Sequence, residues 1–547
     1  MAVGEEPLIV QSGLFEYKNR PRRDTWAAIV WVLLLVGVVV GGIYSATHRN
    51  TQFSRLVQPD YLADGKHCPM RRSLLERAPL EQQEEDLADF FKHASKWLLF
   101  SALGCLVLGL VFLWLFKNHA KPMVRATIRV QVALPVVAGI VLLATGQFTP
   151  GLVALLIGAL SAFCFWLWRN EIDLCARLLT VAAHGLHANP GLLVFVTGAK
   201  ATLIGFIVPV FAFTYLAITN GQVAPNGARG GRQECVNSEG AQVPCCQWQP
   251  DSWVPAYATL NSIAFLWTTF LIFELRVYVI AGTICQWYFM APSNQTSTKG
   301  FTLRSLRLGL TSSFGSLCFG SAILTAVQMA RNAMENARQQ RGGNILLCLV
   351  ACLMECFMQV IEYITKFATM RAAFTGEAFL TAGRSVTDLL KRNFLKAYGV
   401  WWFPPLVLNL ASFLLSAVWG LSVFAMSYAS WHKNTNGLQE SIILGVMCFV
   451  MALIVLAFFA SVLLNVVDAV FLCYAMDKDT QAVTKPEVHE VFSLLPVGVI
   501  VEQPGGSGEV AYGAPVHYVP PASPMAQHAP QQAPHPPSTH YDSSAPV

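Results

Sequence analysis

Residues 25–46 read TWAAIVWVLLLVGVVVGGIYSA and contain no charged side chain, whereas residues 18–23 before them read KNRPRR. A helix of this length rises far enough to cross about 30 Å of hydrocarbon. The run is too long for the apolar region of a cleavable signal peptide, which spans about 7 to 15 residues. It therefore predicts a first membrane helix, with the cationic segment before it in the cytoplasm.

Similar apolar runs recur along the chain. Of its 547 residues, 54% are hydrophobic and 13% are charged, about half the charged fraction of an ordinary soluble domain. Ten runs are long enough to span a bilayer: Thr25–Ala46, Trp97–Phe116, Ile128–Thr145, Gly151–Trp168, Ala201–Thr219, Val254–Leu275, Leu308–Ala330, Asn344–Ile364, Gly399–Ser427 and Ser441–Tyr474. The expected fold is an all-α, polytopic integral membrane protein with about ten transmembrane helices, which leaves no room for a large soluble catalytic domain.

The runs also define the domain organisation. We expect a cytoplasmic N-terminal segment (1–24), a transmembrane domain (25–474) with two long outer loops (47–96 and 220–253), and a cytoplasmic C-terminal segment (475–547). Ten crossings return the C-terminus to the cytoplasm, and the segments assigned to the inside carry more Lys and Arg than those outside.

The chain from about residue 504 is rich in proline and contains no Lys or Arg. Such a composition cannot build a core, which predicts disorder. Pro-rich stretches such as residues 518–521 (YVPP) could bind a partner with an adaptor domain, but the composition favours a plain solvated tail.

Four of the fourteen cysteines fall in the two outer loops: Cys68, Cys235, Cys245 and Cys246. An even number in an oxidising compartment predicts at least one disulfide, with three possible connectivities for two bonds. Free loop thiols are the alternative.

Several function classes lack support. No Walker loop, Gly-x-Ser-x-Gly elbow, His-Glu-x-x-His pair or zinc-type cysteine spacing occurs, so we expect neither an enzyme nor a bound metal or cofactor. The formal charge of +5 is spread without dense basic blocks among aromatics, which argues against a nucleic-acid partner. A transporter or channel in the lipid bilayer remains.

The apolar stretch from Val254 to Ala291 is too long for one simple crossing, so we expect one crossing with a discontinuity or a cytoplasmic overhang rather than two segments. At helical spacing it places three aromatic side chains and one carboxylate on one face: Trp267, Phe270, Glu274 and Tyr278. A carboxylate beside aromatic rings suits a quaternary ammonium ion. An alternative of equal weight is that the aromatics pack in the core while Glu274 pairs with a neighbouring helix.

A second polar face lies in the run Asn344–Ile364, at intervals of three or four residues: Cys348, Cys352, Glu355, Gln359 and Glu362. Because ionisable groups are costly in lipid, we expect this face to look inward. Glu355 could carry a coupling proton or line the pathway together with Gln359 and Glu362, and structural hydrogen bonding is the alternative.

Two inner linkers have the pattern of amphipathic helices that brace the cytoplasmic ends of the bundle. Their apolar positions are Ile172, Cys175, Leu179, Ala182 and Leu186 in one, and Phe379, Val386, Leu389, Leu390 and Phe394 in the other.

Several short motifs follow one another in an order that resembles the choline transporter-like family. They are residues 279–282 (VIAG), 287–289 (WYF), 315–321 (GSLCFGS), 376–379 (GEAF), 467–468 (VD), 471–474 (FLCY) and Asp477. The resemblance covers about residues 170–492. It implies ten helices, cytoplasmic termini, a long first outer loop and movement of choline or ethanolamine, in exchange for protons. The expected location is the plasma membrane. Trp287 and Tyr288, in the second motif, therefore join the candidate substrate-binding residues.

The expected function is thus transport of choline or a related organic cation. The alternative is a non-transporting membrane organiser that affects lipid composition or trafficking through its inner helices and Pro-rich tail. Deleting the residues after Pro504 separates the two, since transport should survive the deletion and a tail-based scaffold should fail.

Overall fold

The computed structural model describes residues 20–50, 53, 78–167, 169–225, 234–236, 242–244, 246–290, 300–341, 345–392, 394–431, 437–480 and 483–493. Cys68, Cys245 and the Pro-rich tail lie outside these ranges, and only the backbone of Cys235 and Cys246 is described. The disulfide and the tail partner therefore stay predictions.

Most described residues lie in helices, and the described strands are four short ones, which confirms the all-α fold. The helices are α1 (Thr25–Thr47), α4 (Ala78–Ala144), α5 (Phe148–Leu167), α6 (Arg169–Ala188), α7 (Gly191–Ile218), α8 (Val254–Tyr288), α9 (Phe301–Leu310), α10 (Phe314–Arg341), α11 (Ile345–Thr375), α12 (Phe379–Arg392), α13 (Phe394–Trp431), α14 (Gly437–Asp479) and α15 (Pro486–Ser493). The strands β1 (Gly221–Pro225), β2 (Glu234–Val236), β3 (Gln242–Pro244) and β4 (Cys246–Pro250) form two antiparallel pairs, β1 with β4 and β2 with β3.

Seven of the described helices are long and apolar enough to cross a membrane, and the bent pair of α9 and α10 makes an eighth. This supports a multi-pass membrane protein, but the count of ten stays a prediction. Two features explain the difference. Two predicted runs are merged in α4 across a non-helical residue, His119, and α11, which contains the eighth run, carries several ionisable side chains.

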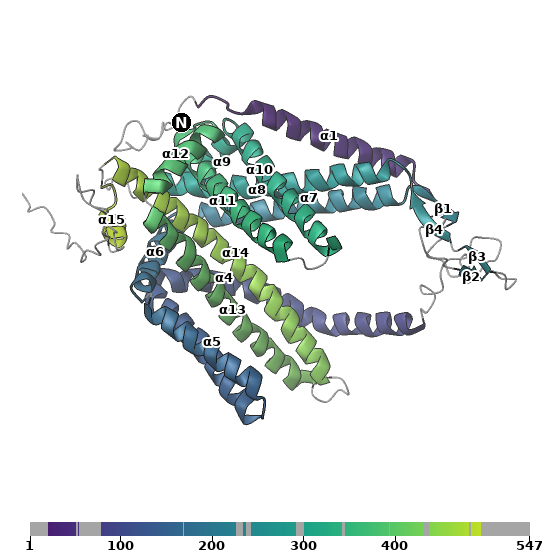
Figure 1. Cartoon of the computed structure of the whole chain (residues 1–547), viewed down its shortest axis with the longest axis horizontal. Coiled ribbons are helices and arrows are strands. Elements are labelled where there is room, and N and C mark those ends of the chain that lie inside the picture. Colours follow the sequence, from purple (N-terminus) through teal and green to yellow (C-terminus); the bar gives the residue numbers. More distant parts are fainter. Residues whose placement is uncertain are drawn as a thin grey trace, which may run out of the picture. The chain divides into compact units, whose positions relative to one another are not determined.

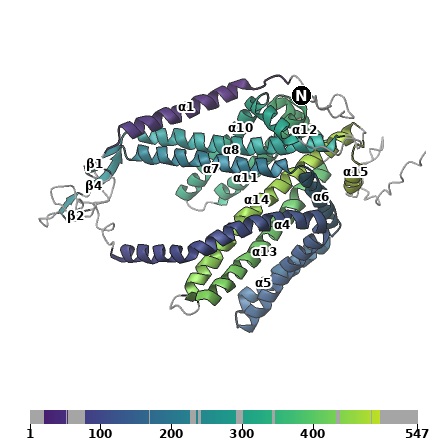
Figure 2. The ribbon, with the colours of Figure 1, turned by 180° about the vertical axis from the view of Figure 1, so that it is seen from behind.

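α1, α7 and α8 run between two ends of the bundle (Figure 1). We call the end that holds residues 20–24, α12 and α15 the terminal end, and the end that holds β1–β4 the strand end (Figure 1). Both views show α7 and α8 side by side with α1 along them, and α13 next to α14 (Figure 2).

α8 is one continuous helix of 35 residues. The discontinuity and the two-segment alternative are therefore both excluded, and one continuous helix longer than the bilayer is thick favours the overhang, whose cytoplasmic location stays a prediction. Every residue from Val277 to Tyr288 is buried, so this overhang is covered by protein rather than by solvent.

The run expected from Leu308 to Ala330 is not one straight helix, which corrects the prediction. α9 and α10 meet at a bend of 75° around Thr311–Ser313. The N-terminal segment packs against this bend, and a Cβ added to Gly315 would clash with the carbonyl oxygens of Arg23 and Asp24. The backbone thus turns where another segment must approach closely.

The two amphipathic linkers form α6 and α12, as predicted. All five apolar positions of the first linker are buried, as are Phe379, Val386, Leu389 and Leu390 of the second, and Phe394 has no described side chain. Both helices lie at the terminal end (Figure 1).

Candidate functional site

Glu274 lies in α8 beside α11. Its side chain is 3% exposed, and its Oε2 atom has no hydrogen-bond partner among the described residues. Thr369 of α11 lies near enough to interact with this carboxyl group, but no hydrogen bond of full geometry joins the two, and the Oγ1 atom of Thr369 is likewise buried without another partner among the described residues. A buried oxygen that has lost water without gaining a partner is costly. A bound ligand or a proton could supply the hydrogen bond or the charge that these two oxygens lack.

Two further charges accompany this carboxyl group. Lys366 of α11 acts electrostatically on Glu274, and its Nζ atom lies 2.5 Å from Oδ2 of Asp468 in α14. When all three groups are ionised, two carboxylates face one ammonium. The cluster therefore has room for one additional positive charge, which a proton or a substrate cation would supply.

A polar stripe on α11 continues from this cluster toward the strand end. At intervals of three or four residues it holds Thr369, Lys366, Glu362, Gln359 and Glu355. These positions span about 21 Å of helix at 1.5 Å per residue. The exposed fraction of the side chain is 37% at Glu355 and 40% at Glu362, so the stripe opens toward the strand end and closes at Glu274.

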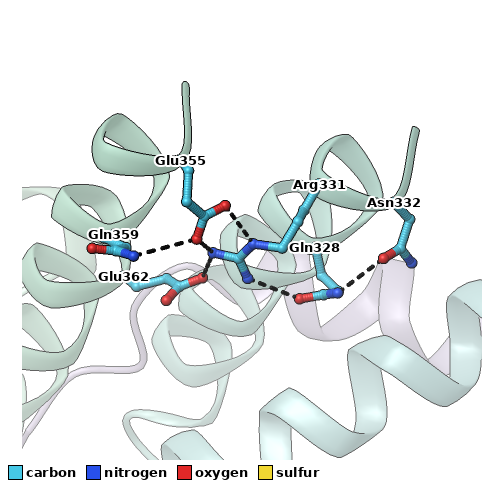
Figure 3. A network of polar contacts seen from close by, with 6 residues as sticks. All are labelled: Gln328, Arg331, Asn332, Glu355, Gln359 and Glu362. Atoms are coloured by element: carbon cyan, nitrogen blue, oxygen red, sulfur yellow. Dashed lines mark hydrogen bonds and ion pairs between the residues drawn. The ribbon is translucent and has the colours of Figure 1, made fainter. Parts of the chain in front are cut away.

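Arg331 of α10 binds the two carboxylates in the more exposed part of the stripe, Glu355 and Glu362. It donates from Nε to Oε2 of Glu355 at 2.9 Å, and from Nη2 to Oε1 of Glu355 and of Glu362, each at 2.9 Å (Figure 3). Gln328 accepts a further bond from Arg331 Nη1, and Gln359 donates to Glu355 (Figure 3). The guanidinium thus ties α10 to α11.

The expectation that this face of α11 looks inward is wrong in part. Cys352 and Gln359 are exposed, because the face lies along α10 at the edge of the described bundle. Arg331, rather than burial, compensates the two carboxylates. The role of Glu355, Gln359 and Glu362 in the pathway stays a prediction.

Three of the predicted aromatics accompany Glu274 on α8. Trp267 donates its Nε1 hydrogen to the carbonyl oxygen of Cys318 and to Ser321 Oγ on α10, at 3.0 and 3.1 Å. Tyr278, one turn beyond Glu274, has its hydroxyl 2.9 Å from Ser313 Oγ. Phe270 is half-buried and meets Phe273 edge to face.

The N-terminal segment closes the terminal end directly beyond Tyr278. Arg20 donates from Nη1 to the Tyr278 hydroxyl and the Ala373 carbonyl, both at 3.2 Å, and from Nη2 to the Phe374 carbonyl at 2.8 Å. These carbonyls end α11, where a cation is favoured by the helix dipole. Gly376, at φ 74°, leaves the space that the Arg20 side chain fills.

Asp24 completes this closure. Its Oδ2 atom accepts a hydrogen bond from Ser316 Oγ at 2.6 Å and from the Phe379 amide, the first of α12, at 3.0 Å. Its φ of 51° lies in the left-handed region, which Asp tolerates better than most residues. Residues 20–24 thus link α8, α10, α11 and α12, one helical turn from Glu274.

Trp287 and Tyr288 lie elsewhere. They are 13 and 14 residues beyond Glu274 on the same helix, or about 20 Å. Tyr288 donates to Oδ2 of the fully buried Asp477, which Thr484 and His489 also contact. The Lys485 Nζ atom lies 4.4 Å from the centroid of the Trp287 ring, and burial lowers the pKa of this lysine. The structure therefore places both aromatics where the segment before α15 docks.

Comparison with known proteins identifies the family. Residues 152–479, more than half of the chain, match the family model described as plasma-membrane choline transporter. The chain belongs to the choline transporter-like family. It is 25% identical to a CTL-like protein of Dictyostelium discoideum over 501 residues, covering 87% of this chain and 89% of that protein. It is also similar to the proteins PNS1 of Gibberella zeae (24% identical; 69% and 64% covered) and Neurospora crassa (25% identical; 73% and 70% covered).

The family match includes Glu274, Lys366, Asp468 and Arg331 but not the closing segment 20–24. The charge cluster therefore belongs to the part of the chain that defines this transporter family, and the closure comes from outside it.

Sequence reasoning missed the partners of Glu274. Lys366 continues the spacing that runs through Glu355, Gln359 and Glu362, and Asp468 is the one charged residue within the last apolar run, Ser441–Tyr474. Both signals were available. The roles of Arg20 and Asp24 had no comparable signal, because their partners are more than 250 residues away.

Proposed function

We propose that this protein transports choline or a related organic cation such as ethanolamine, in exchange for protons, across the plasma membrane with both termini in the cytoplasm. The observation that carries the proposal is the buried Oε2 atom of Glu274, unpartnered among the described residues, in a cluster with room for one additional positive charge. Membership of a family described as plasma-membrane choline transporters supports choline as the substrate and the plasma membrane as the location.

The cluster offers a route to exchange. A proton and a choline ion each bring one positive charge, so either one balances Glu274 and Asp468 against Lys366. Binding of one would then release the other. Trp267, two helical turns before Glu274 on α8, would add cation–π attraction if the quaternary ammonium extends toward its ring, worth about 0.5 to 2 kcal/mol.

The closure at the terminal end supports alternating access. Arg20 is hydrogen-bonded to Tyr278, and Asp24 is hydrogen-bonded to α10 and α12. These contacts would block the path of a cation from Glu274 to the terminal end. The α11 stripe, more exposed at Glu355 and Glu362, leads toward the strand end. The arrangement fits a transporter that is closed on the inside, and release there requires residues 20–24 to move away.

The test is flux of radiolabelled choline into proteoliposomes, with and without a pH gradient. Wild-type protein should carry choline faster when a proton gradient runs against the choline flux. Absence of flux under every gradient would reject transport of choline, whereas flux that ignores the gradient would reject only proton exchange.

Glu274→Gln keeps the side-chain volume and removes the charge. We expect the apparent affinity for choline to fall at least about tenfold, equal to 1.4 kcal/mol, with a melting temperature near that of the wild type. Glu335→Gln, an exposed position on α10, is the matched control. A lower melting temperature with unchanged affinity would show that Glu274 only braces α11.

A further inference from the structure

A pair of cations lies on the opposite side of α8 from Glu274. Lys200 of α7 has its Nζ atom 5.5 Å from the centroid of the Phe273 ring, and Arg276 has its Cζ atom 5.5 Å from the same centroid. Lys200 also approaches the Phe458 ring of α14 at 5.7 Å. Two cations therefore share one aromatic ring between α7, α8 and α14.

Neither cation has an acidic partner within the described ranges. Arg276 donates one long bond, 3.4 Å, to Ser461 Oγ, and its buried Nε atom has no acceptor there. None of the ion pairs found among the described residues includes Lys200 or Arg276. The two charges act on each other and repel. A counter-anion would remove this repulsion and accept the unpartnered N–H.

The depth of the pair identifies the source of the anion. Arg276 lies 22 residues from the strand end of α8 and Lys200 lies 18 residues from that of α7, or about 33 and 27 Å along the helices. The hydrocarbon core is about 30 Å thick. With the hydrocarbon core beginning at the strand ends of α7 and α8, both cations reach the level of the lipid phosphates on the terminal side, and both are half-buried, so lipid can reach them.

We propose that Lys200 and Arg276 bind the phosphate of an anionic phospholipid from the terminal-side leaflet. The planar guanidinium suits two phosphate oxygens, and the ammonium of Lys200 adds a second contact. A zwitterionic headgroup fits less well, because its own ammonium would meet the same cations. The acyl chains would lie along the apolar surfaces of α7 and α14.

Native mass spectrometry of the full-length protein tests this assignment. The probes are phosphatidylglycerol, diacylglycerol with the same acyl chains, and inorganic phosphate. We expect wild-type protein to retain phosphatidylglycerol at least tenfold better than the Lys200→Gln/Arg276→Gln double variant does. Lys391→Gln, at an exposed cation of α12 that pairs with Asp388, is the control and should bind the lipid as the wild type does.

Three results would overturn the proposal. These are equal retention by the double variant, binding of diacylglycerol as tight as that of phosphatidylglycerol, and displacement of the lipid by millimolar inorganic phosphate. The double variant should fold, because it removes a repulsion, and its melting temperature should no longer rise on adding phosphatidylglycerol. If it does not fold, two single variants test the proposal. Lys200→Arg should retain the lipid as the wild type does, whereas Arg276→Lys should retain less of it, because it loses the planar guanidinium that binds two phosphate oxygens.

Discussion

Lys366 and Asp468 set the charge balance around Glu274, and their ion pair joins α11 to α14. The exposed fraction of the side chain is 30% at Lys366 and 14% at Asp468. Water therefore compensates only part of the charge that remains when one partner is removed. Removing one partner of such a pair lowers the stability more than replacing both partners by uncharged residues does, because an uncompensated charge stays behind.

We therefore expect Asp468→Asn to lower the stability by about 3 kcal/mol. The Lys366→Met/Asp468→Asn double variant should lose less free energy of unfolding than the sum of the losses of the two single variants. Thermal melting of the purified protein, analysed as a double-mutant cycle, measures the coupling. Additive losses would show that the two side chains do not interact.

Trp267 provides a second test at the level of one side chain. Its indole N–H donates to Cys318 and Ser321 of α10, which fixes the ring two helical turns before Glu274 on α8. Trp267→Ala should weaken binding of choline more than binding of a neutral analogue with tert-butyl in place of trimethylammonium, because only the cation uses the ring quadrupole. Competition binding with both ligands measures this. Equal losses would leave Trp267 as an apolar contact only.

At the level of elements, Arg331 joins α10 to α11 through Glu355 and Glu362. Removing the guanidinium leaves two carboxylates facing each other on one helix. We expect Arg331→Met to lower the melting temperature by about 2 to 4 °C, since the pairs are half-exposed and screened by water.

The matched control for this change is Arg338→Met, at an exposed position of the same helix. Adding Glu355→Gln and Glu362→Gln to Arg331→Met should restore part of the loss, because it removes the repulsion. A melting temperature that is insensitive to all of these changes would mean that α10 and α11 are held by apolar packing alone.

At the level of the whole molecule, residues 20–24 connect the start of the chain to helices that follow by about 250 to 350 residues. If this closure must open during each transport cycle, a covalent lock should stop transport. Asp24 and Ser316 are in direct contact, so their replacement by cysteines should allow a disulfide to form.

Choline flux through the Asp24→Cys/Ser316→Cys variant should be blocked after oxidation and should recover on reduction. The two single variants, oxidised in the same way, control for the native cysteines. Flux that continues in the oxidised double variant, with the disulfide verified by mass spectrometry, would show that the segment does not act as a gate.

Much of the fold could be predicted from local patterns. The start of α1 at Thr25 and the buried faces of α6 and α12 follow from the length and periodicity of apolar residues. Such patterns act over one or two helical turns, so a single chain segment contains the whole signal. The bend between α9 and α10 does not follow from them, because a distant segment occupies its inner side.

The sequence by itself determined that this is a multi-pass helical membrane protein, which faces of α6 and α12 are buried, and which family it resembles. Only the tertiary structure decided that Glu274 meets Thr369 and Lys366, that Arg331 compensates the α11 stripe, and that Trp287 and Tyr288 lie about 20 Å away from this cluster. The physical reason is range: burial of apolar surface is encoded residue by residue along a helix. The partner of a buried charge, in contrast, is chosen by how helices far apart in the chain pack together.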